Sequence, residues 1–288
     1  MPAKAGPREQ PDLKSFTGFL LRRAFARAVG VEQACIGDDA RVREISVLII
    51  LDEFGAVSQR EVGELTHISP TVMVRLVDGL EDKGWVTRER NVEDRRSYAL
   101  RLTTIGRTKL RRFALDLDAS DRELTADLSP EEAGRLNAHL RTLLDGDPAL
   151  QVHGLASRTS YLLTHAHART REQAQRQLAE FDLHPRDFGL LATVGRDEPC
   201  SQSHLATTLG VSDPAILPAL DALEARGLIT RERNAEDRRV TDVRLTATGH
   251  EVLTGAHKHA ATLQADIVKR LGGKDHADLR ALLSRVIG

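Results

Sequence analysis

The sequence predicts a mainly α-helical protein with small β-hairpins, built from two tandem copies of one domain. Residues 86–96 and 229–239 are identical at nine of eleven positions, at an offset of 143 residues. The same register continues without a gap from about Arg43 to Leu110 against Arg186 to Leu253. The chain is also rich in Ala, Leu and Arg and only 3% aromatic, a composition that favours helix. An internal repeat of this length determines the architecture.

Length and composition fit a two-domain protein of the cytoplasm. The 288 residues suffice for two domains that each bury a core. We divide the chain into a loose tail at 1–11, repeat one at 12–147 and repeat two at 148–288. No apolar run reaches the ~18 residues of a membrane span, and the tail lacks the apolar centre of a secretory signal. Cys35 and Cys200 stand at unmatched places, which suits a reducing cytoplasm without disulfides.

Basic residues are concentrated in one stretch of a chain whose net charge is only −1. Between Lys83 and Arg112 there are ten Lys or Arg residues against three acids. A local basic patch on a balanced protein is typical of a nucleic-acid-binding surface. Charge alone leaves open the alternative of a solvated face without a partner.

Each repeat is expected to begin with four helices. The first has an apolar stripe at helical spacing with arginines on the opposite side, the second is strongly apolar, and the third and fourth are short. We expect the equivalent helices at 12–30 and 159–170, 41–54 and 185–195, 59–66 and 202–209, and 70–83 and 213–226.

Capping residues mark the ends of the short helices. Gly84 and Gly227 follow the fourth helix of each repeat, as a left-handed C-terminal residue would. A serine precedes each short helix as a candidate N-cap: Ser58, Ser69, Ser201 and Ser212.

Two β-like runs then flank a charged turn and predict a β-hairpin with a basic tip in each repeat. The runs are 85–88 with 98–102, and 228–231 with 240–245. After the hairpin, Thr103 and Thr246 begin long helices at about 104–127 and 247–271, and Ser129 caps a last helix that reaches about Leu144. Because only 145–148 is left as a linker, we expect this last helix to run almost directly into the first helix of repeat two.

A helix, a turn, a capped second helix and a basic hairpin make a winged helix-turn-helix. The second helix fits the major groove of DNA with its first residues on base edges, and a basic hairpin tip can reach the minor groove or phosphates. The fold class is therefore mainly α with small β-hairpin wings, in tandem winged helix-turn-helix domains that share a helical, dimerisation-like body.

Both halves resemble the MarR family of bacterial transcription regulators, over about residues 12–287. The resemblance rests on Gly84-Trp85-Val86-Thr87-Arg88 through Asp94-Arg95-Arg96 and then Leu102-Thr103-x-x-Gly106, and on the equivalent residues 227–231, 237–239 and 245–249. It implies a dimer whose first and last helices interlock into a body. It also implies binding to pseudo-palindromic DNA, frequent repression, and release when a small aromatic or anionic molecule binds between body and winged domain.

The expected DNA contacts come from the fourth helix and the hairpin of each repeat. The resemblance implies that Asp94 orients Arg96, and Asp237 orients Arg239, for entry into the minor groove. A soluble hairpin tip is the plainer interpretation of these arginines. The full set of expected DNA-binding residues is Ser69, Thr71, Val72, Arg75, Arg88, Arg90, Asp94, Arg95, Arg96, Ser212, Asp213, Arg231, Arg233, Asp237, Arg238 and Arg239.

The fourth helix of each repeat, here called its reading helix, differs between the two repeats. The first offers hydroxyls, apolar groups for thymine methyls, and Arg75 for guanine or phosphate. The second carries Asp213 in its first turn and has Pro218 in place of the arginine. We expect repeat one to dominate base readout and repeat two to hold DNA through its wing. The alternative is that Pro218 only bends the helix and Arg226 or Arg231 compensates.

The fusion of two such units predicts a single-chain pseudo-dimer, a monomer in solution whose repeats stand in for two subunits. The rival is a homodimer with four wings. An effector would be a small aromatic or anionic molecule. Its expected contacts, which plain core packing would explain equally, are Phe19, Phe25, Phe54, Tyr161 and Phe188.

Two other function classes stay open at this stage. One is a small-molecule-sequestering or protein-interaction module with degenerate DNA binding, and the other is a metal or redox sensor that uses Cys35 or histidines. His165 with His167, and His257 with His259, are spaced by two, which places neither pair on one helical face. We expect no cofactor and no metal. The sequence has no nucleophile–base pair and no phosphate loop, so we expect no enzyme.

Overall fold

The computed structural model of the chain describes residues 12–90, 98–234 and 240–288. Within them it is mainly helical with two small antiparallel sheets, which confirms the predicted fold class. The hairpin tips lie outside the described residues, and with them six of the expected DNA contacts: Asp94, Arg95, Arg96, Asp237, Arg238 and Arg239.

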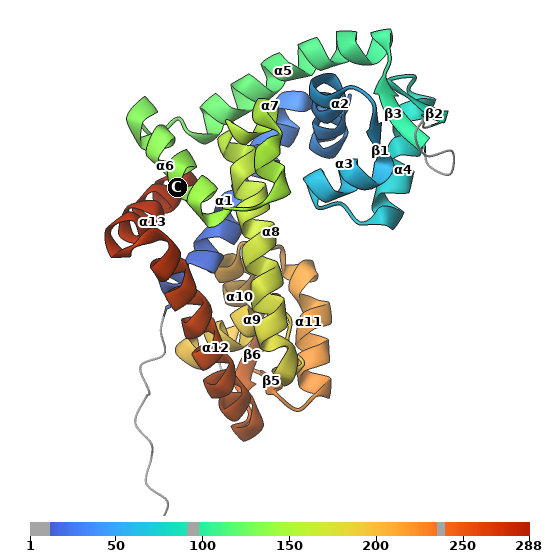
Figure 1. Ribbon diagram of the computed structural model, residues 1–288. Helices are drawn as coiled ribbons and strands as arrows, with labels where there is room; N and C mark the ends of the chain where they lie inside the picture. Colours follow the sequence, from blue (N-terminus) through green and yellow to red (C-terminus); the bar gives the residue numbers. More distant parts are fainter. Residues whose placement is uncertain (1–11, 91–97, 235–239) are drawn as a thin grey trace, which may run out of the picture. The chain divides into compact units, whose positions relative to one another are not determined.

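Among the residues that the structure describes, repeat one has six α-helices and a three-stranded sheet (Figure 1). A 3-10 turn, η1 (Leu13–Ser15), precedes the first helix. The sheet has the order β1-β3-β2, with Val57 opposite Leu100 and Val86 opposite Leu102. The elements are α1 (Thr17–Ile36), α2 (Val42–Phe54), β1 (Val57–Ser58), α3 (Gln59–Thr66), α4 (Pro70–Asp82), β2 (Val86–Arg90), β3 (Tyr98–Leu102), α5 (Thr104–Leu124) and α6 (Pro130–Leu143).

Repeat two has the same order of α-helices and strands, with an additional 3-10 turn, η3, after its first helix, and its sheet is arranged β4-β6-β5. Cys200 pairs with Val243 and Ile229 with Leu245, the same register as in repeat one. The elements are α8 (Thr159–Leu178), η3 (Ala179–Phe181), α9 (Pro185–Asp197), β4 (Cys200–Ser201), α10 (Gln202–Leu209), α11 (Asp213–Ala225), β5 (Ile229–Arg233), β6 (Thr241–Leu245), α12 (Ala247–Leu271) and α13 (Gly273–Ile287).

Two of the four serines predicted to cap the short helices make the capping hydrogen bond. The Ser58 hydroxyl accepts from the Glu61 N–H at 3.2 Å, and that of Ser201 from the His204 N–H at 3.1 Å. Ser69 and Ser212 do stand at the N-cap positions of α4 and α11, but their hydroxyls make no capping bond there, and that part of the prediction is wrong. In α11, a proline at the second helical position removes one of the two N–H donors a cap could use.

The backbone requires two glycines around each hairpin. Gly84 and Gly227 have φ of +68° and +66°, the left-handed conformation predicted for them. Gly106 and Gly249 lie in the first turn of the helix after the hairpin. A Cβ atom there would stand 2.1 Å from the Trp85 carbonyl oxygen and 2.0 Å from that of Leu228, so only glycine lets this helix pack so close to the backbone just before the first hairpin strand.

The connection between the repeats is longer and more structured than predicted. After α6 the chain forms a 3-10 turn, η2 (Pro148–Gln151), and a short helix, α7 (His153–Ala156), before α8 begins. Ala149, Val152 and Leu155 are buried in the core of the winged domain of repeat one. The expectation of an almost direct helix-to-helix passage is therefore wrong, because these apolar side chains dock the linker before α8 starts.

The chain forms two compact units that differ from the two sequence repeats. The first unit comprises Leu21–Ala168 with Arg270–Gly288 and contains the winged domain of repeat one. The second unit joins the described residues up to Leu20 with Arg169–Lys269 and contains the winged domain of repeat two.

The core of each winged domain includes residues from the first segment of the other repeat. In the second unit Leu13 is buried in the core of repeat two, with Phe16 and Phe19 packed against it. In the first unit Leu155 and Tyr161 belong to the core of repeat one. The opening segments of the repeats are thus exchanged between the two winged domains.

The last helices of both repeats pack together inside the first unit, where α13 lies along α6 (Figure 1). Leu136 and Leu140 of α6 and Leu279 and Leu283 of α13 are fully buried. Among the described residues, no helix has the length and apolarity needed to span a membrane.

Candidate nucleic-acid interface

The exposed face of α4 is the candidate reading surface of the first unit. Met73, Val77 and Leu80 recur at helical spacing and are buried. Packing of this stripe onto the winged-domain core turns the opposite face outward. That exposed face carries four expected DNA contacts: Ser69, Thr71, Val72 and Arg75.

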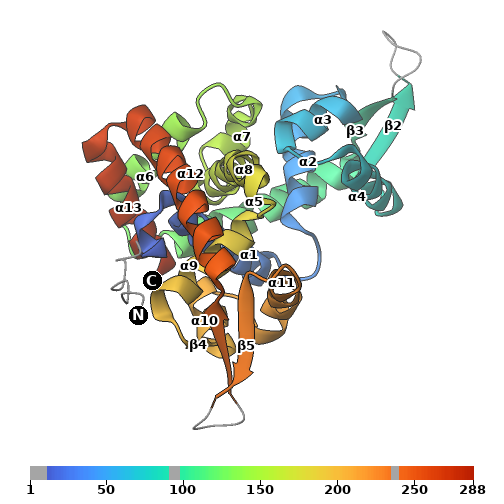
Figure 2. The ribbon, with the colours of Figure 1, turned by 90° about the horizontal axis from the view of Figure 1, so that it is seen from below.

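The chemistry of this face suits base edges. Val72 is 42% exposed, which leaves an apolar surface for a thymine methyl group. Arg75 is exposed one turn further along and makes no hydrogen bond or ion pair with the described part of the chain. Its guanidinium group is therefore available to a guanine or a phosphate. Figure 2 shows the β2–β3 hairpin extending beside α4.

Arg88 on the first strand of the hairpin is bound to the reading helix. Its Nη2 atom lies 2.6 Å from Oδ1 of Asp78, its Nη1 atom contacts the Glu81 carboxylate, and its backbone N–H donates to Glu81 at 2.9 Å. The guanidinium charge is thus neutralised by the helix in the free protein. Arg90, two residues nearer the tip, is exposed.

In the second unit, Arg231 on the first hairpin strand is likewise bound to the acids of α11. Arg231 Nη2 lies 2.7 Å from Oδ1 of Asp221 and also pairs with Glu224 at 2.5 Å. The hydrogen bond with Glu224 raises the pKa of Arg231, and the same bond lowers the pKa of Glu224. Both first-strand arginines therefore fasten a wing to its reading helix. Arg233 is exposed, like its counterpart Arg90.

The reading helix of the second unit differs from α4 in its outer surface. α11 runs without interruption across Pro218, which is exposed, and buries Ile216, Leu220 and Leu223. Ser212 and Asp213 are exposed as expected. No lysine or arginine stands in the first three turns of this helix, so its surface lacks the cation that α4 offers.

Arg226 and Arg231, the two residues that could compensate for Pro218, are both engaged inside the second unit. Arg226 donates to the backbone carbonyls of Asp182 at 2.8 Å and Phe181 at 3.0 Å. Arg231 is held by the acids of α11. Compensation would require one of these residues to give up its present partners.

The five aromatic residues expected near an effector do not gather in one unit. Phe19 and Phe188 belong to the second unit, where Phe188 is buried in the core. In the first unit, Phe25 stacks on His167 with ring centroids 4.8 Å apart, and the Tyr161 hydroxyl donates to the Ala149 carbonyl at 3.2 Å. Phe54 is 45% exposed. Tyr161 and Phe188 are therefore core side chains, Phe19 and Phe25 are partly buried, and an effector role for the five residues stays a prediction.

Sequence reasoning missed a polar hollow of about 420 Å³ in the first unit, between α5, α6 and the start of α8. Asp118 pairs with Arg158 at 2.7 Å, while Asp121 accepts backbone N–H groups from the start of α8. Asn137 Oδ1 and Arg158 Nε are buried without a hydrogen-bond partner among the described residues. These residues are far apart in sequence, so no local pattern could have indicated the hollow.

The histidines singled out in the sequence contact different groups in the structure. In the second unit His257 is packed among Phe16 and Phe188, and His259 pairs with Glu180 at 2.6 Å. His165 instead approaches His67 and Asp147. Burial, followed by the nearby His67, lowers the pKa of His165 to about 4, so its imidazole is neutral at pH 7.

Comparison with known proteins identifies the relatives of both halves. Residues 42–98 and residues 181–240 each match a model of the MarR family. The HTH-type transcriptional regulator PecS of Dickeya dadantii (strain 3937) is 28% identical over 146 residues, which cover 50% of this chain and 83% of PecS. The uncharacterized HTH-type transcriptional regulator YdgJ of Bacillus subtilis (strain 168) is 31% identical over 97 residues, 34% of this chain and 59% of YdgJ.

Solved structures match about half of the chain. The transcriptional repressor CouR bound to a 23-mer DNA duplex is 37% identical, with a TM-score of 0.41 over 45% of this chain and 90% of CouR. A mutant MarR from E. coli complexed with operator DNA is 23% identical, with a TM-score of 0.43 over 44% of this chain and 91% of that protein.

Proposed function

We propose that this chain, which belongs to the MarR family of DNA-binding transcription regulators and carries one family domain in each half, binds its operator as a single-chain pseudo-dimer. It acts as a repressor that a small molecule releases. The observation that carries the proposal is the duplicated pair of a reading helix and a hairpin, α4 with β2–β3 and α11 with β5–β6.

The reciprocal exchange of opening segments supports the pseudo-dimer. Leu13 of repeat one completes the core of the second unit, while Leu155 and Tyr161 complete that of the first. Each winged domain thus takes from the other repeat what, in a dimer, a second subunit would supply. The packing of α6 on α13 supports it further, since the last helices of both repeats already cover each other.

Unequal reading of two half-sites is part of the proposal. Arg75 and Val72 give α4 both a cation and an apolar contact for bases. α11 offers Asp213 and Pro218 at its outer surface, so its domain holds DNA mainly through the wing. The operator then has one well-specified half-site and one tolerant half-site.

Selection from a random duplex library by the full chain tests this function. We expect one enriched motif, bound by one chain per duplex, with affinity that falls as salt rises because phosphate contacts release counterions. Light scattering of the free chain should give a mass near 31.7 kDa. A mass near twice that value would overturn the single-chain pseudo-dimer in favour of a four-winged homodimer. Failure to enrich any motif would count against sequence-specific binding.

An effector site at the polar hollow of the first unit accompanies the regulatory proposal. Arg158 Nε and Asn137 Oδ1, which have no hydrogen-bond partner within the described ranges, would supply a donor and an acceptor for a small anionic or aromatic molecule. A panel of aromatic carboxylates, screened by release of the selected duplex, tests it. Release by one compound that an Arg158→Lys variant no longer responds to is the expected result, and equal release from that variant would exclude this hollow.

A further inference from the structure

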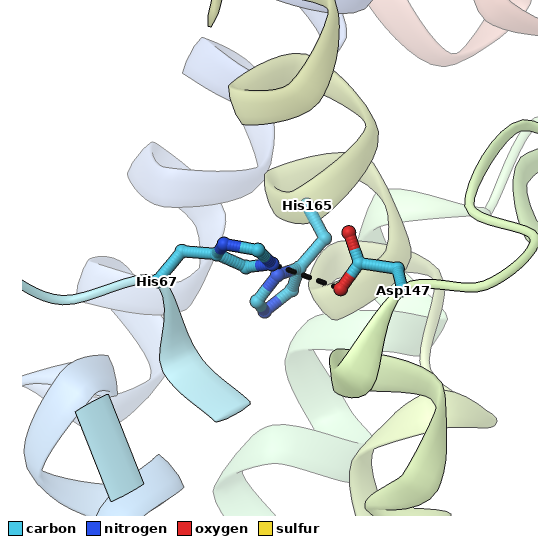
Figure 3. A group of neighbouring side chains, drawn as sticks. All are labelled: His67, Asp147 and His165. Atoms are coloured by element: carbon cyan, nitrogen blue, oxygen red, sulfur yellow. Dashed lines mark hydrogen bonds and ion pairs between the residues drawn. The ribbon is translucent and has the colours of Figure 1, made fainter. Parts of the chain in front are cut away.

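Three side chains from separate parts of the chain converge in the first unit (Figure 3). His67 lies in the turn between α3 and α4, Asp147 lies in the linker just before η2, and His165 lies on α8. One ligand atom of each lies within 4.8 Å of the other two. Two imidazoles and a carboxylate are typical ligands of a transition-metal ion.

The cluster contains a buried nitrogen atom that the fold does not satisfy. His165 is 4% exposed, and its Nδ1 atom has no hydrogen-bond partner among the described residues. Its ring lies 5.2 Å from the ring of His67 and 4.3 Å from that of Tyr161, measured between centroids. A buried polar atom without a partner is costly, so such an atom beside two potential metal ligands points to a ligand between them.

The other two side chains are held in place. Nε2 of His67 lies 2.8 Å from Oδ1 of Asp147, and the same oxygen accepts the backbone N–H of Ala149 at 2.9 Å. Burial would raise the pKa of Asp147, but the hydrogen bonds from His67 and Ala149 outweigh it and keep the pKa below its usual range. The carboxylate is therefore ionised at neutral pH.

The backbone at His67 adds an independent observation. His67 ends α3 with φ of +52°, in the left-handed region. At the equivalent position 143 residues later the chain has Gly210, with φ of +64°. Glycine occupies such a conformation without the steric cost that a side chain bears. The imidazole stands in repeat one where the fold itself would favour glycine.

We propose that His67, Asp147 and His165 bind one divalent transition-metal ion, with Zn²⁺ the ion that this donor set favours. On a tetrahedral ion with bonds of 2.0–2.1 Å, ligand atoms stand roughly 3.3 Å apart. The His67–Asp147 pair then opens slightly and His165 closes in, movements that side-chain rotation supplies. A fourth position stays open for water or an anion. In repeat two Gly210 stands in place of His67, and the described residues of that repeat contain no counterpart of the site.

The ion would act on the reading helix. His67 precedes Ser69, the N-cap residue of α4, by two positions, while Asp147 and His165 belong to the linker and α8. A bound ion therefore links the turn that precedes α4 to the linker and to α8, and so restrains the orientation of α4. This regulatory step rests on the proposed function, because it assumes that α4 reads DNA; the metal site itself does not.

Metal binding is measured first without DNA, on full-length protein that carries no histidine tag and has been stripped with a chelator. Calorimetric titration with Zn²⁺ should give a stoichiometry of one ion per chain. Co²⁺ should give the visible absorption of a tetrahedral site with nitrogen and oxygen ligands. His67→Gly should weaken binding at least tenfold, as should Asp147→Asn, which retains the oxygen that accepts from Ala149. His153→Gln, which alters an 88% exposed imidazole of the same unit, serves as the matched control.

Thermal melts of metal-free variants separate a lost ligand from a lost fold. His67→Gly should melt no lower than the native chain, because glycine suits the left-handed conformation. Absence of a one-to-one Zn²⁺ complex, or equal affinity in His67→Gly and His153→Gln, would overturn the site. A chain that binds Zn²⁺ but enriches no DNA motif would refute the proposed function and leave the site standing.

Coupling to DNA is tested with the duplex selected by the native chain. Saturating Zn²⁺ should change the affinity for that duplex at least fivefold, and His67→Gly should remove the change. Equal affinity with and without bound Zn²⁺ would overturn the regulatory step while the site remains.

Discussion

Arg135 Nε lies 3.0 Å from Asp278 Oδ2, and the two residues occupy the same position in the two repeats, 143 residues apart. In a symmetric dimer, a helix position that meets its own copy faces an identical side chain. Here that position carries opposite charges on α6 and α13. His139 adds a second contact to Asp278, with Nε2 3.0 Å from Oδ2. The repeats have thus become complementary to each other, which disfavours pairing of a repeat with its own copy.

Reversal of one charge at this position should destabilise the packing of α6 against α13. Asp278→Arg places a cation opposite Arg135, so we expect a melting temperature lower by a few degrees in low salt and a smaller difference in high salt. The double variant Arg135→Asp with Asp278→Arg should recover most of the loss because the pair is restored with its charges exchanged. Calorimetric melts at two salt concentrations measure both effects. Independent, additive losses in the double variant would contradict a direct pairing.

Local signals in the sequence predicted the winged domains well because local forces determine their boundaries. Ser58 and Ser201 cap their helices through bonds that span three residues, and Gly84 and Gly227 adopt the predicted left-handed conformation. The first helices were placed less well. The first helix was expected at 12–30 and α1 lies at Thr17–Ile36, because Leu13–Ser15 form the separate turn η1 and the far end of α1 buries Ile36 in the core of repeat one. The two-residue strands β1 and β4 are too short to leave a pattern.

Features that depend on distant contacts escaped sequence reasoning. Burial of Val152 and Leu155 requires a core formed by residues a hundred positions earlier. The cluster of His67, Asp147 and His165 joins residues 80 and 18 positions apart, with no ligand spacing to reveal it. One signal was available, the histidine that stands where repeat two has glycine.

Arg75→Ala should weaken binding to the selected duplex more than any single change on α11. Loss of a bidentate contact to guanine costs about 1–3 kcal/mol, roughly a tenfold to hundredfold loss of affinity. Pro218→Arg, which gives α11 the cation of α4, should instead strengthen binding. Fluorescence anisotropy with labelled duplex measures both, with Arg176→Ala on the exposed face of α8 as a charge-matched control. Native affinity in Arg75→Ala would refute the asymmetry of the two readers.

Arg88 and Arg90 should respond differently to alanine, although they are two residues apart on one strand. Arg88 is bound to Asp78 and Glu81, so Arg88→Ala should lower the melting temperature and leave the salt dependence of DNA binding close to native. Arg90 is exposed, and Arg90→Ala should reduce the slope of log affinity against log salt by about 1 unit if it meets a phosphate. Binding isotherms at four salt concentrations give the slopes. The reverse pattern would assign the DNA contact to Arg88.

Glu32 should make the stability of the first unit depend on pH. Its side chain is 4% exposed, and burial raises its pKa to about 7, opposed by a hydrogen bond with Ser160 and assisted by Asp121. The native state then holds a proton that the unfolded chain, with a pKa near its ordinary value of 4.5, releases. Stability contributed by this group is complete below pH 4.5 and is lost as pH rises through 7.

Glu32→Gln keeps the shape of the neutral acid and removes its titration. Between pH 5 and pH 8 the free energy of unfolding of the variant should rise relative to that of the native chain by on the order of 2 kcal/mol, since each unit of pKa shift corresponds to about 1.4 kcal/mol. His165 titrates with the opposite sign, because its lowered pKa removes stability as pH falls, but it contributes equally to both proteins and cancels in the difference. Urea unfolding across this range measures the difference. Parallel stability curves for the native chain and Glu32→Gln would show that Glu32 is ionised in the folded state at pH 5, because Ser160 and Arg158 would then outweigh its burial.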